Sequence, residues 1–303
     1  MLPKPPPRHP QLGFIYAPPY RIQGHSVAGE ATVVHVPELD LAFDIGACPK
    51  PVLPANVVAL SHGHMDHIAS IAYYFSQRHF QDMAPGHLVC PPSLEAPIRN
   101  LMDAWVNIEQ QRTPHQITPL APDDEINLKG HLYLRAFQTD HRVPSQGYAV
   151  IERRTKLKEE FAGLPQEQLV ELKKQGTEIT NAFQIPLIAY TGDTAAGPHL
   201  DRPEVTEADT LIAECTFLEP GHRGRARIGK HMHLDDILDL LEACKATHVI
   251  LIHLSRRTML NVARKTLDKY IPPRHRDRVH LLMDNRTNMA RYDDQLAAAE
   301  AAE

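Results

Sequence analysis

Residues 61–67 read Ser-His-Gly-His-Met-Asp-His, directly after an apolar run, and this heptad decides how the rest of the chain is interpreted. Alternate residues of an extended segment point to the same side, so His62 and His64 can converge on one metal ion. Asp66 and His67 come where a helix is expected to begin, and they therefore face another direction. Two pairs of nitrogen and oxygen ligands aimed in two directions indicate a binuclear site for Zn²⁺ or a similar first-row ion.

The abundance of histidine supplies an alternative explanation for the heptad. The chain contains 19 histidines, and a single histidine is more often a hydrogen-bonded core or surface residue than a ligand. Three histidines and one aspartate within seven residues at the end of an expected strand are not explained in this way. The heptad therefore predicts a metal site.

The bulk composition is that of an ordinary globular protein. The chain has 303 residues, 43% of them hydrophobic and 23% charged, which fits one α/β domain. No run approaches the ~18 apolar residues that span a bilayer, and the start lacks the apolar core of a secretory signal. The four cysteines form no CxxC pair, which favours reduced thiols and a cytoplasmic location. The net charge of −5 does not indicate nucleic-acid binding unless basic residues gather locally.

The pattern along the chain predicts one main domain with an insertion. Residues 1–19 form a proline-rich extension that we expect to be irregular, and residues 20–290 form the domain. Residues 153–184 interrupt its pattern as an irregular inserted arm with a helix near 164–174. The Ala/Glu-rich tail, 291–303, is expected to fray or to form a helix end that packs on nothing. The remaining expected strands are 31–36, 41–44, 131–137, 147–151, 185–190, 210–214 and 249–252, and the remaining expected helices are 68–81, 92–106 and 234–244.

Three more polar residues end apolar strands. His141, Asp193 and His253 each follow such a run. Singly, each could be a turn residue or a polar cap. Because the carboxyl ends of the strands meet at one rim of a sheet, their shared position predicts that they join the heptad. The expected ligand sets are His62, His64 and His141 for one ion, Asp66, His67 and His253 for the other, with Asp193 bridging.

In chain order these segments resemble the ligand motifs of the metallo-β-lactamase fold. Within that superfamily, residues 20–283 most resemble the short, plant-type form of tRNase Z. The likeness includes residues 42–49, 145–148, 156–164, 172–180 and 214–218. It implies an α/β fold, an αββα sandwich of two mixed β-sheets flanked by helices, with a short inserted arm. The heptad alone marks only the superfamily, which also contains lactamases, thioesterases and lactonases.

The resemblance implies a zinc-dependent endoribonuclease that removes the 3′ trailer from precursor tRNA. Two Zn²⁺ ions, or Mn²⁺ or iron, would lower the pKa of a shared water, and attack by that metal hydroxide would leave a 5′-phosphate on the trailer. The resemblance makes Asp66, Glu214 and His231 the catalytic residues. His231 would protonate the leaving 3′-oxygen, oriented by Glu214. His233, two residues away, is the alternative candidate for the general acid, and both histidines could instead cap a helix.

RNA binding is expected from the arm and from residues near the last ligand. The expected substrate contacts are Thr194, Arg257, Lys156, Lys158 and Lys173. Arg256 could also hold a phosphate, which would fix position without reading sequence. The charge of the arm is mixed, however, so a solvated helix without an RNA role is the alternative. The resemblance also implies a homodimer.

Several positions depart from the family pattern. Ala69 and Ser70 replace two glycines, Lys230 replaces a glycine, and Thr258 replaces an aromatic residue. These changes leave every ligand in place but put the fit of the tRNA end in question. The main alternative is therefore a binuclear-zinc phosphodiesterase acting on small or non-tRNA phosphodiesters. A lactonase or thioesterase and a non-catalytic RNA-binding subunit are weaker alternatives, and no Gly-x-Ser-x-Gly motif supports a serine nucleophile.

Overall fold

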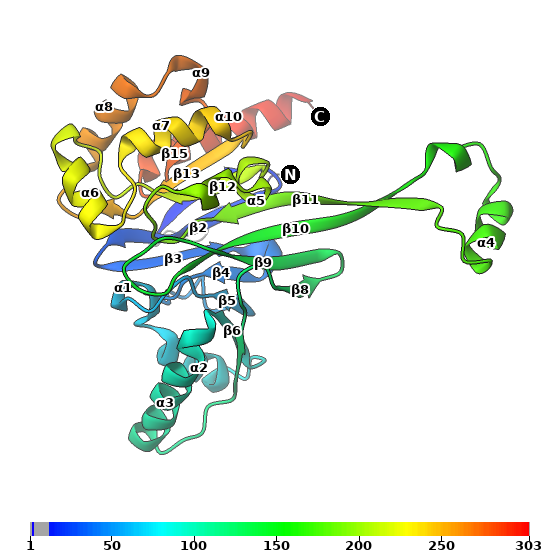
Figure 1. Cartoon of the computed structure of the whole chain (residues 1–303). Coiled ribbons are helices and arrows are strands. Elements are labelled where there is room, and N and C mark those ends of the chain that lie inside the picture. Colours follow the sequence, from blue (N-terminus) through cyan, green and yellow to red (C-terminus); the bar gives the residue numbers. More distant parts are fainter. Residues whose placement is uncertain (1, 3–11, 303) are drawn as a thin grey trace.

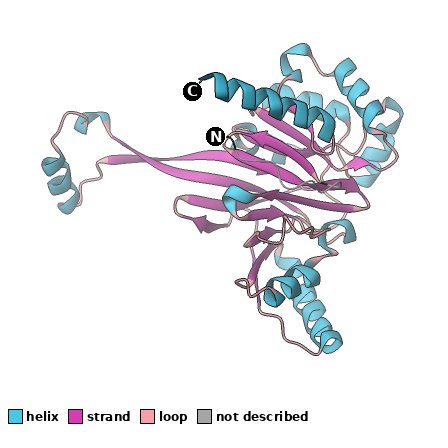
Figure 2. Ribbon diagram, turned by 180° about the vertical axis from the view of Figure 1, so that it is seen from behind, coloured by secondary structure: helices cyan, strands magenta, loops and turns pink. Residues whose placement is uncertain are grey.

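Two β-sheets pack face to face, with helices on the outer face of each (Figures 1 and 2). The computed structural model describes Leu2 and residues 12–302. This arrangement confirms the expected αββα sandwich. Among the described residues, no helix combines the length and the apolar character needed to cross a bilayer.

Both sheets are mixed. In the first sheet the strands from β1 to β4 pair antiparallel and those from β4 to β7 pair parallel. Its strands are β1 (Gly13–Ala17), β2 (Tyr20–Ala28), β3 (Ala31–Val36), β4 (Leu41–Phe43), β5 (Val57–Ala59), β6 (Gly86–Cys90) and β7 (His115–Pro119), with β14 (Leu254–Ser255) beside β2. In the second sheet the order is β15-β13-β12-β11-β10-β9-β8. Its strands are β8 (Glu125–Lys129), β9 (Leu132–Gln138), β10 (Gln146–Leu157), β11 (Thr180–Tyr190), β12 (Thr210–Glu214), β13 (His248–Ile252) and β15 (Val279–Leu281).

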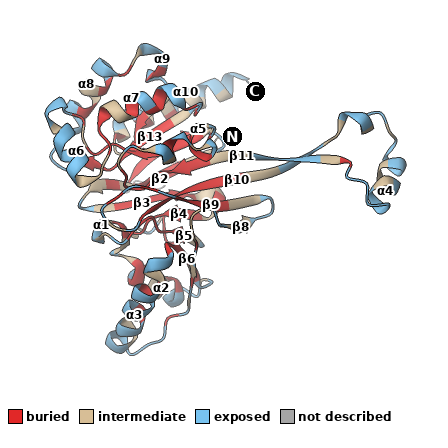
Figure 3. Cartoon of the chain, viewed as in Figure 1, coloured by how far each residue is buried: buried red, intermediate tan, exposed pale blue. Residues whose placement is uncertain are grey.

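Three apolar layers hold the sandwich together (Figure 3). One lies between the sheets, one lies under the helices of the first sheet, and one lies under the helices of the second. The α-helices are α1 (Met65–Ile68), α2 (Ile71–Phe80), α3 (Pro92–Glu109), α4 (Gln166–Lys174), α5 (Pro203–Thr206), α6 (Arg223–Gly229), α7 (Leu234–Ala243), α8 (Leu260–Tyr270), α9 (Pro273–Arg276) and α10 (Asn285–Ala302). Short 3₁₀ turns lie at Pro37–Leu39, Glu159–Phe161, Pro198–Asp201 and Pro220–His222. Strands β12 and β13 read as continuous apolar runs because both of their faces are buried.

The helix expected over 68–81 is interrupted. The chain forms the short α1, leaves the helix at Ala69 and Ser70, and begins α2 at Ile71. The Ser70 N–H donates to the Ile45 carbonyl at 2.9 Å instead of continuing the first helix. This contact ties the heptad to the loop after β4.

The arm is built from strands, which corrects the expectation of an irregular segment at 153–184. Strands β10 and β11 continue far beyond the sheet as a two-stranded ribbon with α4 at its tip (Figure 1). Their pairing runs as far as Leu157 opposite Thr180. The predicted helix near 164–174 is confirmed as α4.

The two ends of the described chain pack on each other. Residues 13–17 of the proline-rich extension form the buried strand β1, so this part is not irregular. The tail continues α10 and does pack, since the ring of Tyr292 meets Phe14 edge-on at 5.4 Å and Gln295 Nε2 donates to the Tyr16 carbonyl at 3.2 Å. Residues 1, 3–11 and 303 lie outside the described part, and the division into extension, domain and tail stays a prediction.

Candidate metal centre and active site

The predicted ligands lie at one rim of the sandwich, where strands of both sheets end. His62 and His64 lie in the loop after β5, and Asp66 and His67 lie on α1. The other three follow β9, β11 and β13, in that order His141, Asp193 and His253. The structure thus brings together seven side chains from four distant stretches of sequence.

The first group of ligand atoms surrounds His64. Its Nδ1 lies 2.9 Å from His62 Nε2 and 3.2 Å from His141 Nε2. Asp193 Oδ2 lies 3.8 Å from His62 Nε2. One ligand atom from each of these four residues lies within 4.8 Å of the others, which is the spacing of atoms that share one ion.

The second group surrounds the same aspartate. Asp193 Oδ2 lies 3.2 Å from His67 Nε2 and 3.3 Å from His253 Nε2. Asp66 Oδ2 lies 3.4 Å from His253 Nε2 and 3.8 Å from His67 Nε2. Asp193 therefore stands between the two groups, in the position of a bridging ligand.

Two features of these atoms fit a bound cation better than hydrogen bonding alone. Asp193 Oδ1 is buried and accepts no hydrogen bond from the described residues. His67 Nε2 and His253 Nε2 face each other at 3.4 Å. Imidazole nitrogens and carboxylate oxygens are the donors that zinc takes in proteins.

The outer ring nitrogens are held away from the centre. His141 Nδ1 donates to the Lys230 carbonyl at 2.9 Å, and His253 Nδ1 lies 3.0 Å from Thr216 Oγ1. His62 Nδ1 lies 2.9 Å from Ser61 Oγ. Partners of this kind fix the orientation of metal-ligating histidines. They leave the inner nitrogens of these rings free to bind an ion.

The electrostatics of the cluster also favour metal binding. Burial, helped by the neighbouring imidazoles, lowers the pKa of His62 to about 2. Burial likewise lowers the pKa values of His64 and His141, so these rings are neutral, which is the form that binds a metal ion. Burial opposes charge on His67 as well, but two carboxylates, Asp193 and Asp44, raise its pKa well above the usual value. The position between Asp193 and His67 thus attracts a cation.

Asp44 is a buried support that the sequence analysis did not assign to the site. Its Oδ2 accepts from His67 Nδ1 at 2.7 Å, from Ser61 Oγ at 2.8 Å and from the Tyr190 hydroxyl, while its Oδ1 accepts from the Ser61 N–H at 2.6 Å. It ends β4 with a φ of 58°, a left-handed conformation of the kind that gathers at functional sites. Through Ser61 it also steadies His62.

The pair formed by Glu214 and His231 borders the cluster. Glu214 is fully buried at the end of β12, and its Oε1 lies 2.8 Å from His231 Nδ1. The Thr194 N–H and the Thr216 hydroxyl also donate to this carboxylate, at 2.8 and 2.6 Å. Burial opposes charge on His231, yet Glu214 raises the pKa of the ring to about 9. His231 Nδ1 is 4.0 Å from Asp193 Oδ2, and the ring also groups with Asp193 and His253 at ligand spacing, so it adjoins the predicted metal ligands.

His233 has a structural role instead. Its Nδ1 accepts from the Asp235 N–H at 3.1 Å at the start of α7, and its Nε2 donates to the Glu219 carbonyl at 2.9 Å. The Asp236 side chain completes a capping box by accepting from the His233 N–H. Helix capping therefore explains His233 but not His231.

Comparison with known proteins agrees with this geometry. Residues 46–254 match the beta-lactamase superfamily domain. Chloroplastic tRNase Z TRZ2 of Arabidopsis thaliana is 33% identical over 253 residues, which is 82% of this chain and 72% of that protein. The tRNase Z TRZ1 of the same plant is 31% identical over 257 residues, 84% of this chain and 92% of that protein. The chain belongs to the tRNase Z family.

Solved structures share the fold of this tRNase Z family member. The human short-form tRNase Z aligns with a TM-score of 0.53 at 17% identity, covering 81% of this chain and 93% of that one. The metallo-beta-lactamase fold protein YhfI of Bacillus subtilis aligns with a TM-score of 0.56 at 16% identity, covering 89% and 95%. At these identities the likeness concerns the fold alone.

The expected substrate contacts lie in three different settings. Thr194 is fully buried, and its hydroxyl bonds to the Asp140 N–H at 3.1 Å, which makes it a support beneath the rim rather than an open surface group. Arg256 and Arg257 are exposed just after His253. The three lysines lie on the arm: Lys156 on β10, Lys158 just beyond it and Lys173 on α4.

Proposed function

We propose that the chain is a zinc-dependent endoribonuclease that removes the 3′ trailer from precursor tRNA. Membership in the tRNase Z family supports this activity. The observation that carries it is the Glu214–His231 pair, 2.8 Å apart, at the edge of the seven predicted metal ligands. Hydrolysis of RNA needs a proton for the departing sugar oxygen, and this pair can supply it.

The proposed site holds two Zn²⁺ ions, with Mn²⁺ or iron as alternatives. His62, His64 and His141 would hold one ion, Asp66, His67 and His253 the other, and Asp193 would bridge them. When bound, such a pair of ions lowers the pKa of a water and stabilises negative charge at phosphorus. The Gly29 N–H holds Asp66 in place by donating to its Oδ2 at 2.8 Å.

The proton path runs through His231. Glu214 binds Nδ1, so the proton that leaves the ring is the one on Nε2. Delivered to the 3′-oxygen of the tRNA side, this proton lets the bond to phosphorus break and leaves the 5′-phosphate on the trailer. Glu214 stabilises the charged imidazole before that step.

The arm is proposed to hold the body of the tRNA. The ammonium groups of Lys156, Lys158 and Lys173 have no ion-pair partner in the described chain, so they are available to phosphates. By contrast, Arg153 is held by Glu125 and lies 3.9 Å over the Tyr133 ring. Phosphate contacts fix the position of an RNA without reading its sequence.

A homodimer and a cytoplasmic location belong to the same proposal. Large apolar side chains are exposed along α2 and α3. Tyr73 and Phe80 are seven residues apart on α2, as are Leu101 and Ile108 on α3, so each pair lies on one face of its helix. Such faces favour a contact with a second copy of the chain, which sedimentation of the purified protein would test.

The decisive experiment gives the zinc-loaded protein two substrates. A precursor tRNA with a defined trailer is expected to yield a trailer that carries a 5′-phosphate. Bis(p-nitrophenyl) phosphate serves as the small diester. If the protein turns over the small diester rapidly and leaves the precursor intact, the alternative of a general phosphodiesterase replaces the proposal.

A further inference from the structure

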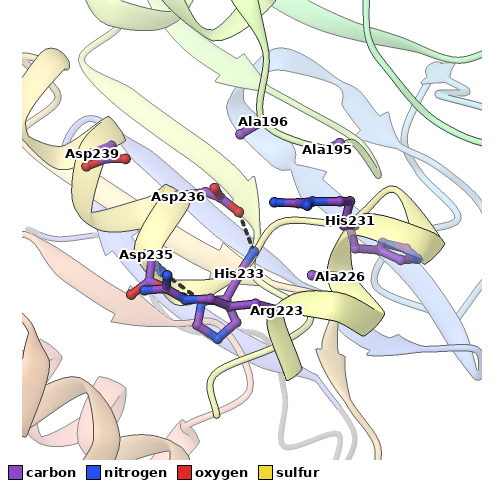
Figure 4. Close-up of a pocket in the computed structure, with 10 residues that line it drawn as sticks. Ala195, Ala196, Arg223, Ala226, His231, His233, Asp235, Asp236 and Asp239 are labelled. Atoms are coloured by element: carbon purple, nitrogen blue, oxygen red, sulfur yellow. Dashed lines mark hydrogen bonds and ion pairs between the residues drawn. The ribbon is translucent and has the colours of Figure 1, made fainter. Parts of the chain in front are cut away.

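A pocket on the outer side of His231 is distinct from the metal centre. Its volume is about 330 Å³. It lies between the loop after Asp193 and helices α6 and α7 (Figure 4). Its lining residues are Ala195, Ala196, Arg223, Ala226, Arg227, His231, His233, Asp235, Asp236 and Asp239. His231 is thus shared by the catalytic rim and this pocket.

Most charges in the pocket are already paired within the protein. The Arg223 guanidinium contacts the Asp235 carboxylate, and Asp236 accepts from the His233 N–H at 2.8 Å. Two exposed side chains remain, Arg227 on α6 and Asp239 on α7. Neither has an ion pair or side-chain hydrogen bond among the described residues. The pocket therefore offers one free cation and one free carboxylate.

These two free groups suit a nucleotide better than a bare anion. The cavity holds more carboxylates than guanidiniums, which disfavours an isolated phosphate within it. A nucleotide carries an anionic phosphate at one end and N–H donors on the edge of its base at the other. An arginine binds phosphate well, and an aspartate accepts from an exocyclic amino group. Asp239 lies at the opposite end of the pocket from His231 (Figure 4).

The direction of the proposed reaction identifies which nucleotide this is. His231 gives its proton to the 3′-oxygen on the tRNA side, so the sugar bearing that oxygen lies against the His231 ring. The base and the 5′-phosphate of that nucleotide need space beyond the ring, outside the cluster of predicted metal ligands. The pocket that His231 lines offers such space.

We propose that this pocket is the subsite for the nucleotide that becomes the new 3′ end of the tRNA. Arg227 holds its 5′-phosphate and Asp239 accepts from the amino edge of its base. The inference rests on the proposed function, because it takes the substrate and the direction of cleavage from it. Arg227 is then a binding residue and Asp239 a residue that sets base preference.

Helix α6 supplies a matched control for the test. Arg227 lies four residues after Arg223 and shares its face, whereas Arg225, two residues away, points to a different face. Arg225 is exposed, does not line the pocket and lies 3.3 Å from His222. Arg227→Ala and Arg225→Ala thus remove the same charge from the same helix, inside and outside the pocket.

The test measures kcat/KM of the zinc-loaded, full-length protein on precursor tRNA at several salt concentrations. Arg227→Ala is expected to lower kcat/KM on the order of tenfold and to reduce the salt slope by about one phosphate contact. Arg225→Ala is expected to stay within about twofold of wild type. Zinc content and the thermal unfolding midpoint verify that both variants are intact.

A second readout addresses the base. For a set of precursors that differ only in the nucleotide 5′ of the cleavage site, Asp239→Asn is expected to change the order of kcat/KM values, while Arg225→Ala keeps it. Equal losses in the two arginine variants, or an unchanged order in Asp239→Asn, would overturn the subsite while leaving the proposed function standing. A wild-type protein that cleaves only small diesters would overturn both.

Discussion

Replacing Asp44 by asparagine should weaken metal binding although Asp44 touches no metal. Its carboxylate accepts four hydrogen bonds from three residues: two from Ser61 and one each from His67 and Tyr190. All four partners donate, and a carboxylate offers only acceptors. An asparagine of the same shape replaces one acceptor oxygen by an NH₂ group that is itself a donor.

The magnitude can be worked from these contacts. The amide oxygen would best take the place of Oδ2, where three donors converge, so that the NH₂ group meets the Ser61 N–H now bonded at 2.6 Å. Leaving one buried donor unsatisfied costs about 1–3 kcal/mol. Replacing the charged outer partner of a metal-ligating histidine typically weakens metal affinity roughly 10–100-fold. At about 1.4 kcal/mol per factor of ten, this loss is about 1.4–2.8 kcal/mol of zinc-binding free energy, while the unsatisfied donor lowers the stability of the fold.

The assay is zinc competition against a chromophoric chelator, with zinc content measured after dialysis. Asp40→Asn is the matched control, because Asp40 is also an aspartate at positive φ, 52°, near the same strand. Its carboxylate lies on the surface, 3.2 Å from the Lys129 ammonium. A surface pair of this kind contributes little, so Asp40→Asn should keep wild-type zinc affinity. Wild-type zinc affinity in Asp44→Asn would refute the role assigned to this carboxylate.

The other predictions concern catalysis, backbone conformation and the pH dependence of stability. His231→Ala is expected to keep its zinc and lose about 10²–10⁴-fold in single-turnover rate, whereas His62→Ala loses zinc; loss of zinc from both would contradict the assignment. Gly192→Ala places a Cβ 2.7 Å from a neighbouring side chain at a φ of +59°. A left-handed alanine alone costs ~1–2 kcal/mol, so the steric contact should lower the thermal unfolding midpoint further than this cost implies. Gly163→Ala is the control and should change the midpoint little, because open space surrounds Gly163. Burial and an adjacent arginine lower the pKa of His280 to about 3, below its unfolded value of about 6.5. The folded state therefore binds fewer protons than the unfolded state, and stability falls as the pH drops below about 6.5. His280→Gln should flatten this loss by up to about 1.4 kcal/mol per pH unit in urea unfolding between pH 7 and 5, and equal slopes in both proteins would count against it.

The ligand candidates were accessible from sequence because each ends an apolar strand. His141, Asp193 and His253 share that position, and parallel strands bring their carboxyl ends to one rim. The residues that support the predicted ligands were harder to identify from the sequence. Asp44 also follows an apolar strand, so the same pattern could have assigned it to the site. Tyr190 could not, because its hydroxyl reaches Asp44 only through the packing of one sheet on the other.

The arm shows a different limit of sequence interpretation. The basic run at 153–157 did not predict a strand, because both faces of this part of the ribbon are largely exposed and no alternation of apolar residues is required. Backbone pairing of β10 with β11 holds it instead. The break in the helix after Ile68 could not be predicted from the sequence either, since it depends on the distant carbonyl of Ile45.

Positive charge in the sequence does not distinguish among the candidate RNA contacts of this chain, whereas the internal partners of each charge do. Arg153 and Arg223 are both cationic, yet each already faces a carboxylate of the protein. Moving either one to an RNA phosphate would first require that pair to break. Lys156 and Arg227 need no such exchange, because the described chain gives them no counter-ion. One lies on the arm and the other beside the proposed proton donor, so a bound tRNA would be held both at its body and at the nucleotide whose 3′-oxygen departs.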